Sequence, residues 1–175
     1  MNSTTLVIGC LHSALYAINY DLLHSGQHYD IRMREILLEE LGIRIDIQLN
    51  YQNTNKSSSQ LIQLMNLIND YLQKCNKNYH NAMVIGDVNT TLAGALVANK
   101  NKIKIIHIES GLRAGEWESE ETNRKLITAC SDFHFCPSRL SFQNLINENI
   151  PKDSIFFVGN TMAETFLDLQ ESRKK

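Results

Sequence analysis

The chain has 175 residues and a net charge of −2, and its composition is 43% hydrophobic and 21% charged. These values are typical of a globular protein with a substantial core and exclude disordered, collagen-like and coiled-coil proteins. The near-neutral charge gives no bulk attraction for nucleic acid or acidic lipid, and no apolar run approaches the roughly 18 residues of a membrane span. We therefore expect one domain that binds neither nucleic acid nor membrane.

The cysteines and the N-terminal residues bear on whether the chain is cytoplasmic or secreted. Cys10, Cys75, Cys130 and Cys136 form no CxxC pair and are too few for a disulfide scaffold. The first residues, MNSTT, lack the basic start of a secretory signal. The sequence therefore predicts a reduced, cytoplasmic chain.

Short apolar segments alternate with helical patterns along the whole chain. The strands we expect cover residues 5–9, 19–23, 43–49, 82–85, 103–108, 133–136 and 155–158. The helices we expect cover residues 33–41, 61–75, 91–99, 120–130, 138–147 and 162–171, where the pattern allows apolar positions three and four residues apart. This alternation predicts an α/β fold with a doubly wound, mostly parallel sheet of about 7 strands in a single Rossmann-like domain over residues 1–175.

Three segments depart from a regular alternation. Residues 1–20 leave only about 10 positions for the first crossover, so the first β-α unit should be abbreviated. Residues 50–60, NYQNTNKSSSQ, are polar and predict a mobile surface loop. The charged tail over 171–175 should be frayed.

A polar segment, GDVNTT, follows the expected strand 82–85. Ligands of open α/β sheets bind beyond the carboxyl ends of the strands, which makes Asp87 a candidate. Asn89, Thr90 and Thr91 could cap the next helix, whose free N–H groups would suit an anion. The simpler interpretation is a capped turn with a structural aspartate.

A second polar segment, HIESGLRAG, begins at His107. Its first two residues are the last two of the next expected strand, 103–108. His107 and Glu109 alternate onto one face. Glu109 could form an internal ion pair with Arg113, or it could converge with Asp87 on one crevice, as acid–base chemistry requires. A metal site from these residues is disfavoured because the spacing matches no zinc pattern, so we expect no metal.

Two further segments have simple structural interpretations. WESEETNR, ending at Arg124, resembles a capping box in which Ser119 opens a helix, although this does not explain its cluster of acids. SGQHYD, from Ser25 to Asp30, reads as a turn with a cap. The chain has no G-x-G-x-x-G and no Walker loop, so we expect neither a nicotinamide nor an ATP site.

Taken together and in this order, these segments resemble the N-terminal domain of UDP-N-acetylglucosamine 2-epimerases. The matching stretches are SGQHYD, GDVNTT, HIESGLRAG, EETNR and FVGNT, which span roughly residues 20–165. HIESGLRAG followed by EETNR is the specific part. The resemblance implies one Rossmann-like half of a GT-B-type two-domain fold, with the active site in the cleft between the halves.

The family resemblance also implies a reaction at C2 of the sugar, which converts UDP-GlcNAc to UDP-ManNAc. A base takes the C2 proton while UDP leaves C1, and UDP then re-adds, or water adds in the hydrolysing enzymes. No cofactor is needed, and the ligand is a UDP-N-acetylhexosamine. By position, the resemblance assigns catalytic roles to Asp87, Glu109 and Glu120, and substrate-binding roles to Gln27, His28, Arg113, Asn123 and Arg124.

The sequence departs from the family pattern in two places. Gly9-Cys10-Leu11-His12 stands where the family has Gly-Thr-Arg-Pro-Glu, and the family's second half has no counterpart in these 175 residues. One wall of a cleft cannot orient a substrate or exclude water, so we expect little epimerase activity from this chain alone. A separate chain could supply the missing half, or the chain could form a homo-oligomer. The alternatives are an inactive remnant or binding module, and a phosphate- or metal-dependent hydrolase on a similar sheet.

Overall fold

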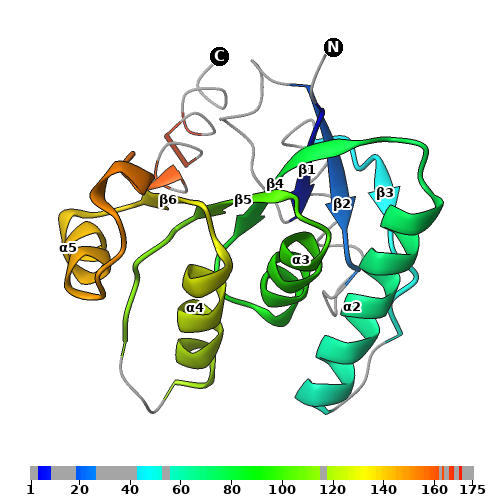
Figure 1. Cartoon of the computed structure of the whole chain (residues 1–175), viewed down its shortest axis with the longest axis horizontal. Helices are drawn as coiled ribbons and strands as arrows, with labels where there is room; N and C mark the ends of the chain where they lie inside the picture. The colour runs from blue at the N-terminus through cyan, green and yellow to red at the C-terminus, as the bar shows by residue number, and fades with distance from the viewer. Residues whose placement is uncertain are drawn as a thin grey trace.

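The sheet is the frame of the molecule (Figure 1). The computed structural model describes residues 4–8, 19–26, 43–52, 56–114 and 118–161, with residues 163, 166, 167 and 170. Within these residues, seven strands form one sheet. They are β1 (Thr4–Ile8), β2 (Tyr20–His24), β3 (Ile47–Gln48), β4 (Tyr79–Ile85), β5 (Lys104–Ile108), β6 (Phe133–Cys136) and β7 (Ile155–Phe157).

All neighbouring strands pair in parallel, in the order β3-β2-β1-β4-β5-β6-β7. The predicted α/β fold with a parallel sheet of about 7 strands is therefore confirmed. The chain runs outward from β1 through β2 to β3 and then continues on the other side of β1 with β4. This reversal is the topological switch point, where open α/β sheets bind their ligands. Asp87 comes two residues after the end of β4 and so lies beside this switch point.

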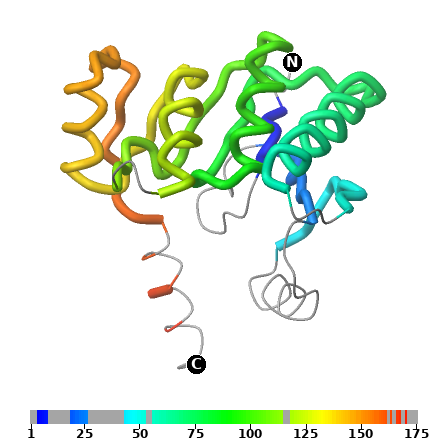
Figure 2. Tube along the Cα trace, turned by 90° about the horizontal axis from the view of Figure 1, so that it is seen from below, coloured from blue at the N-terminus to red at the C-terminus, as the bar shows by residue number. Residues whose placement is uncertain are grey.

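Helices of the described residues cover one face of the sheet, as Figure 2 shows. They are α2 (Ser57–Lys74), α3 (Asn89–Lys100), α4 (Ser119–Cys130) and α5 (Arg139–Asn147), with a 3-10 turn η1 (Lys152–Ser154) before β7. Because α3 lies between α2 and α4, it is apolar nearly all round, and Gly94 lets it approach β1 closely. A Cβ placed on Gly94 would lie 2.6 Å from Cδ1 of Ile8.

Side chains of the central strands are buried on both faces of the sheet. Ala82 and Val84 of β4 join the main core under the helices, whereas Met83 joins a second cluster with Val7 and Ile108. Burial on both faces explains why these strands read as continuous apolar runs rather than as alternating ones.

The two largest changes to the predicted boundaries concern α2 and β3. Ser57–Gln60 form the first turn of α2, so the prediction of a loop over 50–60 is wrong for its last four residues. Two of these polar side chains bond to α3, since Asn89 donates to Ser57 and Gln60. In addition, β3 comprises two residues of the expected 43–49.

Other predictions fall outside the described residues. These are the abbreviated unit between residues 9 and 18, the helix over 33–41, most of the helix over 162–171 and the tail over 171–175.

Candidate functional site

The carboxyl ends of β4 and β5 are bonded to each other at the switch-point side of the sheet. The amide of Gly86 donates to the Ile108 carbonyl at 3.2 Å, and Nε2 of His107 bonds the Gly86 carbonyl at 3.0 Å. Because the strands are parallel neighbours, the residues that follow them emerge at the same edge. The sequence prediction that Asp87 and Glu109 leave adjacent strands is thus supported by the geometry.

Glu109 is held in an unusual backbone conformation with its carboxylate free. Its φ is +64°, a left-handed value that is uncommon for a residue with a side chain and is found at functional turns. Its carboxylate lies over the neighbouring turn, since a Cβ placed on Gly86 would be 3.8 Å from Oε2. Glu109 makes no hydrogen bond or ion pair to any residue in the described part of the chain.

Burial raises the pKa of Glu109, and the negative charge of Asp87 raises this pKa further. The two carboxylates are therefore close enough for the charge of Asp87 to act on Glu109. A free carboxylate with a raised pKa is a stronger base than an ordinary surface glutamate. Among the described carboxylates whose pKa is shifted, Glu109 is the one whose pKa is raised, which favours taking a proton.

Asp87, in contrast, is fixed from α4. Nε and Nη2 of Arg124 contact Oδ2 of Asp87 at 2.8 and 2.7 Å, and the Asn123 side chain donates to the Asp87 carbonyl at 2.8 Å. The side chain of Arg124 is 14% exposed and that of Asp87 is 27% exposed. The EETNR segment thus positions the GDVNTT turn, 37 residues earlier in the chain.

The alternative ion pair between Glu109 and Arg113 is wrong. Arg113 binds Glu148 after α5 through two contacts of 2.7 and 2.6 Å, and it donates to the Thr128 hydroxyl at 3.2 Å. These bonds direct Arg113 away from Glu109 and anchor the loop after β5 to α4 and to the turn after α5.

Glu121 is a buried residue that the sequence reasoning missed as a functional candidate. Its carboxylate accepts from the Ala114 amide at 3.2 Å and pairs with Arg124 at 3.2 Å and with Arg113 at 3.8 Å. With a 7% exposed side chain, it joins the loop after β5 to α4. Its spacing of three residues from Arg124, on one helix face, was the available signal.

The predicted helix caps are also wrong. The residues at the N-caps of α3 and α4 are Val88 and Glu118, and neither side chain accepts a cap bond. The side chains expected to cap bind elsewhere: Thr91 donates to the Ile85 carbonyl at 2.7 Å, and Ser119 donates to Glu120 at 2.7 Å. Both hydroxyls thus make other local hydrogen bonds in place of a cap.

For the remaining predicted site residues, Glu120, Gln27 and His28, the described part of the chain shows no contact with Asp87 or Glu109. The hydrogen bond from Ser119 lowers the pKa of Glu120, and the described contacts do not bring Glu120 to Asp87 or Glu109. Gln27 and His28 lie outside the described residues. The segment just before them is near the start of α3, because the Thr90 hydroxyl donates to the Ser25 hydroxyl at 3.0 Å.

His107 lies directly behind these turns. It is 2% exposed, and burial lowers its pKa to about 4, so the ring is neutral at physiological pH. Nδ1 of this ring is buried without a hydrogen-bond partner among the described residues. His107 therefore joins the two turns through one neutral bond, to Gly86. No group of three or more His, Cys, Asp or Glu in the described residues is arranged to hold a metal ion.

The comparisons with known proteins agree with this geometry. The family model for UDP-N-acetylglucosamine 2-epimerase matches residues 13–175. The chain belongs to the UDP-N-acetylglucosamine 2-epimerase family.

Two curated relatives show how much of such an enzyme the chain represents. It is 40% identical to the UDP-2,3-diacetamido-2,3-dideoxy-D-glucuronate 2-epimerase of Pseudomonas aeruginosa, over 83% of this chain and 42% of the relative. It is 39% identical to a UDP-N-acetylglucosamine 2-epimerase of Methanococcus maripaludis, over 82% of this chain and 39% of the relative. The chain thus spans less than half the length of these family members.

Solved structures of the family show the same half of the fold. The enzyme from Neisseria meningitidis bound to UDP-GlcNAc matches with a TM-score of 0.84 and 28% identity, over 98% of this chain and 50% of that one. The Methanocaldococcus jannaschii enzyme in complex with UDP-GlcNAc and UDP matches with a TM-score of 0.84 and 31% identity, over 95% and 49%. The domain is therefore one Rossmann-like half of the GT-B-type fold of this epimerase family.

No helix in the described part of this family member is both long and apolar enough to cross a membrane.

Proposed function

We propose that this chain forms the acidic wall of a UDP-N-acetylhexosamine 2-epimerase active site. The observation that supports this most directly is the free carboxylate of Glu109 with its raised pKa, which lies over Gly86 and within the field of Asp87. Membership of the family, and similarity to enzymes solved in complex with UDP-GlcNAc, support the substrate class.

In the proposed reaction, Glu109 removes the proton from C2 of the sugar. The electron pair of the broken C–H bond forms a C1–C2 double bond, and the bond from C1 to the UDP oxygen breaks with its electrons going to UDP. Re-addition of UDP to C1, with protonation of C2 from the opposite face, gives the epimer. Asp87 and Glu120 are the other proposed acidic residues.

The family assignments for the polar residues divide into two groups. Asn123 and Arg124 are proposed as positioning residues, because they hold the Asp87 turn. Arg113 is proposed to support the loop after β5 through Glu148. Gln27 and His28 stay proposed substrate-binding residues by family position alone.

A second wall is part of the proposal, because the relatives that this chain matches are about twice its length. The described surface supplies a place for it. Strand β7 is at the edge of the sheet, and Phe156, Phe157 and Val158 there are 43, 54 and 47% exposed. Exposed apolar groups at a sheet edge are typical of surfaces that another element covers. We propose that a separate chain with the second half of the fold covers them, with a second copy of this chain as the alternative.

A cytoplasmic location completes the proposal. The described cysteines Cys75, Cys130 and Cys136 are all free thiols, which is the usual state in a reducing compartment.

The decisive experiment follows exchange of the C2 proton of UDP-GlcNAc in heavy water by NMR. The chain is tested alone and mixed with the C-terminal half of the M. maripaludis relative. We expect exchange in the mixture, and a loss of about 100-fold or more with Glu109→Gln, which is nearly isosteric and cannot accept the proton. Lys152→Gln, far along the chain in η1, is the matched control and should exchange normally.

Two other outcomes would overturn parts of this proposal, the first the epimerase activity and the second the role of Glu109. UDP-GlcNAc binding by calorimetry, without exchange in any mixture, would make the chain a binding module. Exchange that survives Glu109→Gln unchanged would remove Glu109 from the chemistry.

A further inference from the structure

Three consecutive residues at the end of β5 all meet Gly86, and the proposed reaction uses only the last of them, Glu109. The Ile108 carbonyl accepts from the Gly86 amide at 3.2 Å, and Nε2 of His107 bonds the Gly86 carbonyl at 3.0 Å. The Glu109 carboxylate lies over the same residue, since a Cβ placed on Gly86 would be 3.8 Å from Oε2. Both backbone polar groups of Gly86 are therefore held from β5, one by the main chain and the other by a side chain.

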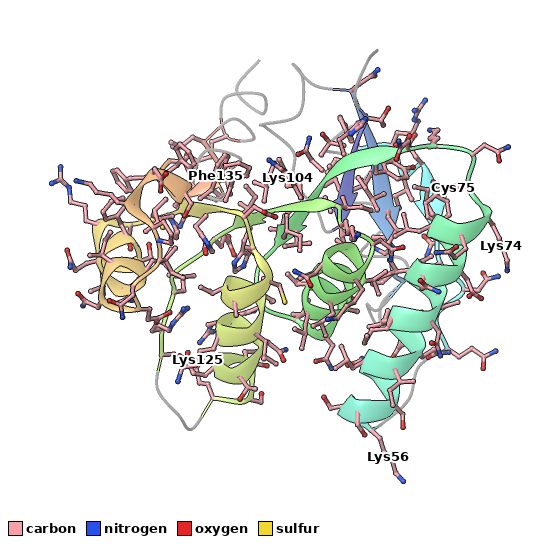
Figure 3. The ribbon with its side chains drawn as sticks, in the orientation of Figure 1. Lys56, Lys74, Cys75, Lys104, Lys125 and Phe135 are labelled. Atoms are coloured by element: carbon pink, nitrogen blue, oxygen red, sulfur yellow. The ribbon has the colours of Figure 1, made fainter. Side chains whose placement is uncertain are left out.

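The side chain of His107 lies under the helices, behind the turns. Ile106 and Ile108 pack in the second core cluster with Phe135, which lies on the side of the sheet away from Lys125 of α4 (Figure 3). Because side chains alternate along a strand, His107 points to the other face, which the helices cover. It is 2% exposed there.

This buried ring is only half satisfied. A carbonyl oxygen only accepts, so Nε2 of His107 carries the proton and donates it to Gly86. Nδ1 is then an acceptor, and it is buried with no hydrogen-bond partner in the described part of the chain. An unpaired buried acceptor lowers stability, so packing alone would favour an apolar side chain at this position. The bond to Gly86 is what a histidine adds here.

The neighbouring histidine on the same face binds a side chain instead of a turn. His134 of β6 is paired with His107 in the register of the two strands and is 1% exposed. Its Nδ1 bonds the Ser110 hydroxyl at 3.0 Å. Of these two buried rings, His107 is thus the one that holds the main chain of the β4 turn.

The Gly86 carbonyl is a sensitive place to hold this turn. Gly86 has a φ of +73°, and a glycine can adopt many other conformations if it is released. Its carbonyl belongs to the planar peptide group that continues into Asp87, so a bond to this oxygen fixes the plane from which Asp87 starts. Asn123 and Arg124 of α4 hold Asp87 from the other side. Without His107, Asp87 would be tied to α4 but less firmly to β5.

We propose that His107 is a positioning residue for the two acids. Its ring fixes the peptide between Gly86 and Asp87 against β5 and thereby sets the separation of the Asp87 and Glu109 carboxylates. It acts through Gly86 and takes no part in the proton transfer itself. Its effect on the reaction rests on the proposed function, whereas the placement of the two acids can be measured on the chain alone.

The first test is a titration of Glu109 in the chain alone, followed by carboxyl ¹³C chemical shifts. His107→Leu removes the N–H donor but keeps a buried apolar side chain, and His107→Gln keeps an N–H near the place of Nε2. The charge of Asp87 is one cause of the raised pKa of Glu109. Like charges move apart when a turn is released, so we expect the pKa of Glu109 to fall in His107→Leu and to stay at its wild-type value in His107→Gln.

The second test is exchange of the C2 proton of UDP-GlcNAc, in the mixture with the C-terminal half of the M. maripaludis relative. His107→Leu should lower the exchange rate at saturating substrate by about tenfold or more, because a small misplacement of a reacting group is costly. KM should change by less than about threefold, since His107 is proposed to touch no part of the substrate. His107→Gln should restore most of the rate.

Ile105→Val is the matched control on the same strand. Ile105 is 0% exposed and belongs to the main core under the helices. The variant should lower the midpoint of urea unfolding through lost packing, while the Glu109 titration and the exchange rate stay unchanged. Circular dichroism of all variants establishes that they fold.

The outcomes separate the positioning role from the proposed function. An unchanged Glu109 titration and exchange rate in His107→Leu would overturn the role of His107 and leave the function intact. Equal losses in His107→Leu and His107→Gln would also overturn it, because they would assign the effect to the packing of the ring rather than to its N–H. Absence of exchange with the wild-type mixture would overturn the proposed function instead, and the Glu109 titration would then decide on His107 by itself.

Discussion

The turns after β4 and β5 lie side by side and yet treat their carboxylates in opposite ways. Asp87, after β4, is fixed by Arg124 and Asn123 of α4. Glu109, after β5, has no such partner among the described residues, and its backbone is left-handed. A pair of acids in different environments can take different roles, because the environment pushes their proton affinities apart. The comparison teaches that one turn holds its carboxylate in an ion pair, whereas the other leaves its carboxylate unpaired among the described residues with a raised pKa.

The largest effect should come from closing the space beside the β5 turn. A Cβ on Gly111 would lie 2.2 Å from the Ser141 carbonyl oxygen, and Gly111 has a φ of +82°. Gly111→Ala should therefore cost about 3 kcal/mol or more in the free energy of unfolding, measured in urea. Gly159→Ala is the matched control, since its φ is +87° but nothing lies within 4 Å, so it should cost only about 1 kcal/mol. Equal losses in the two variants would contradict the packing at Gly111.

The next largest effect should come from acid, which protonates the buried ring of His107. Burial lowers the pKa of His107 from 6.5 to about 4, so the unfolded chain binds a proton in this interval that the folded chain does not. Stability should thus be highest above pH 6.5 and fall as the pH drops towards 4, with about 3 kcal/mol from His107.

His107→Gln is the variant that isolates this contribution, because its amide can still donate to Gly86 but does not titrate. It should flatten part of the slope of unfolding free energy against pH. Part will remain, since burial also lowers the pKa of His134 to about 4. An unchanged slope in the variant would show that His107 is not buried and neutral.

The next effect should come from Glu121, which pairs with Arg124, the residue that holds Asp87 after β4. Glu121→Gln leaves Arg124 and Arg113 without their shared buried carboxylate, so we expect a loss of about 2 kcal/mol in unfolding free energy. Glu148→Gln removes another partner of Arg113, at a side chain that is 36% exposed, and should cost about 0.5 kcal/mol. If the Glu148 variant loses as much as the Glu121 variant, Glu121 is not the centre of the network.

The smallest expected effect is a shift in the pKa of Glu109, which compares the two carboxylates without unfolding the protein. Asp87→Asn removes the negative charge that acts on Glu109, so the pKa of Glu109 should fall towards its ordinary value. It should remain raised, because burial is the larger cause of the shift. Carboxyl ¹³C chemical shifts against pH measure this directly. Asp153→Asn in η1 is the control and should leave the pKa of Glu109 unchanged; a Glu109 titration that is the same in all three proteins would place Asp87 and Glu109 in separate spaces.

Sequence reasoning recovered the sheet because its signals are local. Strand β6 was predicted at its observed bounds, and the apolar runs of β4 and β5 mark strands covered on both faces. The start of α2 was missed because Ser57 and Gln60 look like loop residues until Asn89 of α3 binds them. Helix propensity is a weak guide where a tertiary contact decides.

The candidate site was predicted only in part, because local motifs show which residues end the strands but not which distant residues they bind. Placing Asp87 and Glu109 on adjacent strand exits followed from the parallel fold and the order of the motifs. The partners of Arg113 could not be predicted, because Glu148 is 35 residues away and the local choice was Glu109. The role of Glu121 was hidden behind a capping pattern that the structure does not use.

The amino-acid sequence by itself determined the architecture, the family and the two acidic strand exits, since hydrophobic periodicity and short motifs are written within a few consecutive residues. The tertiary structure alone decided which carboxylate is neutralised and which is free. That choice depends on how α4 lies against the ends of β4 and β5, and burial and ion pairing are properties of this packing rather than of any segment.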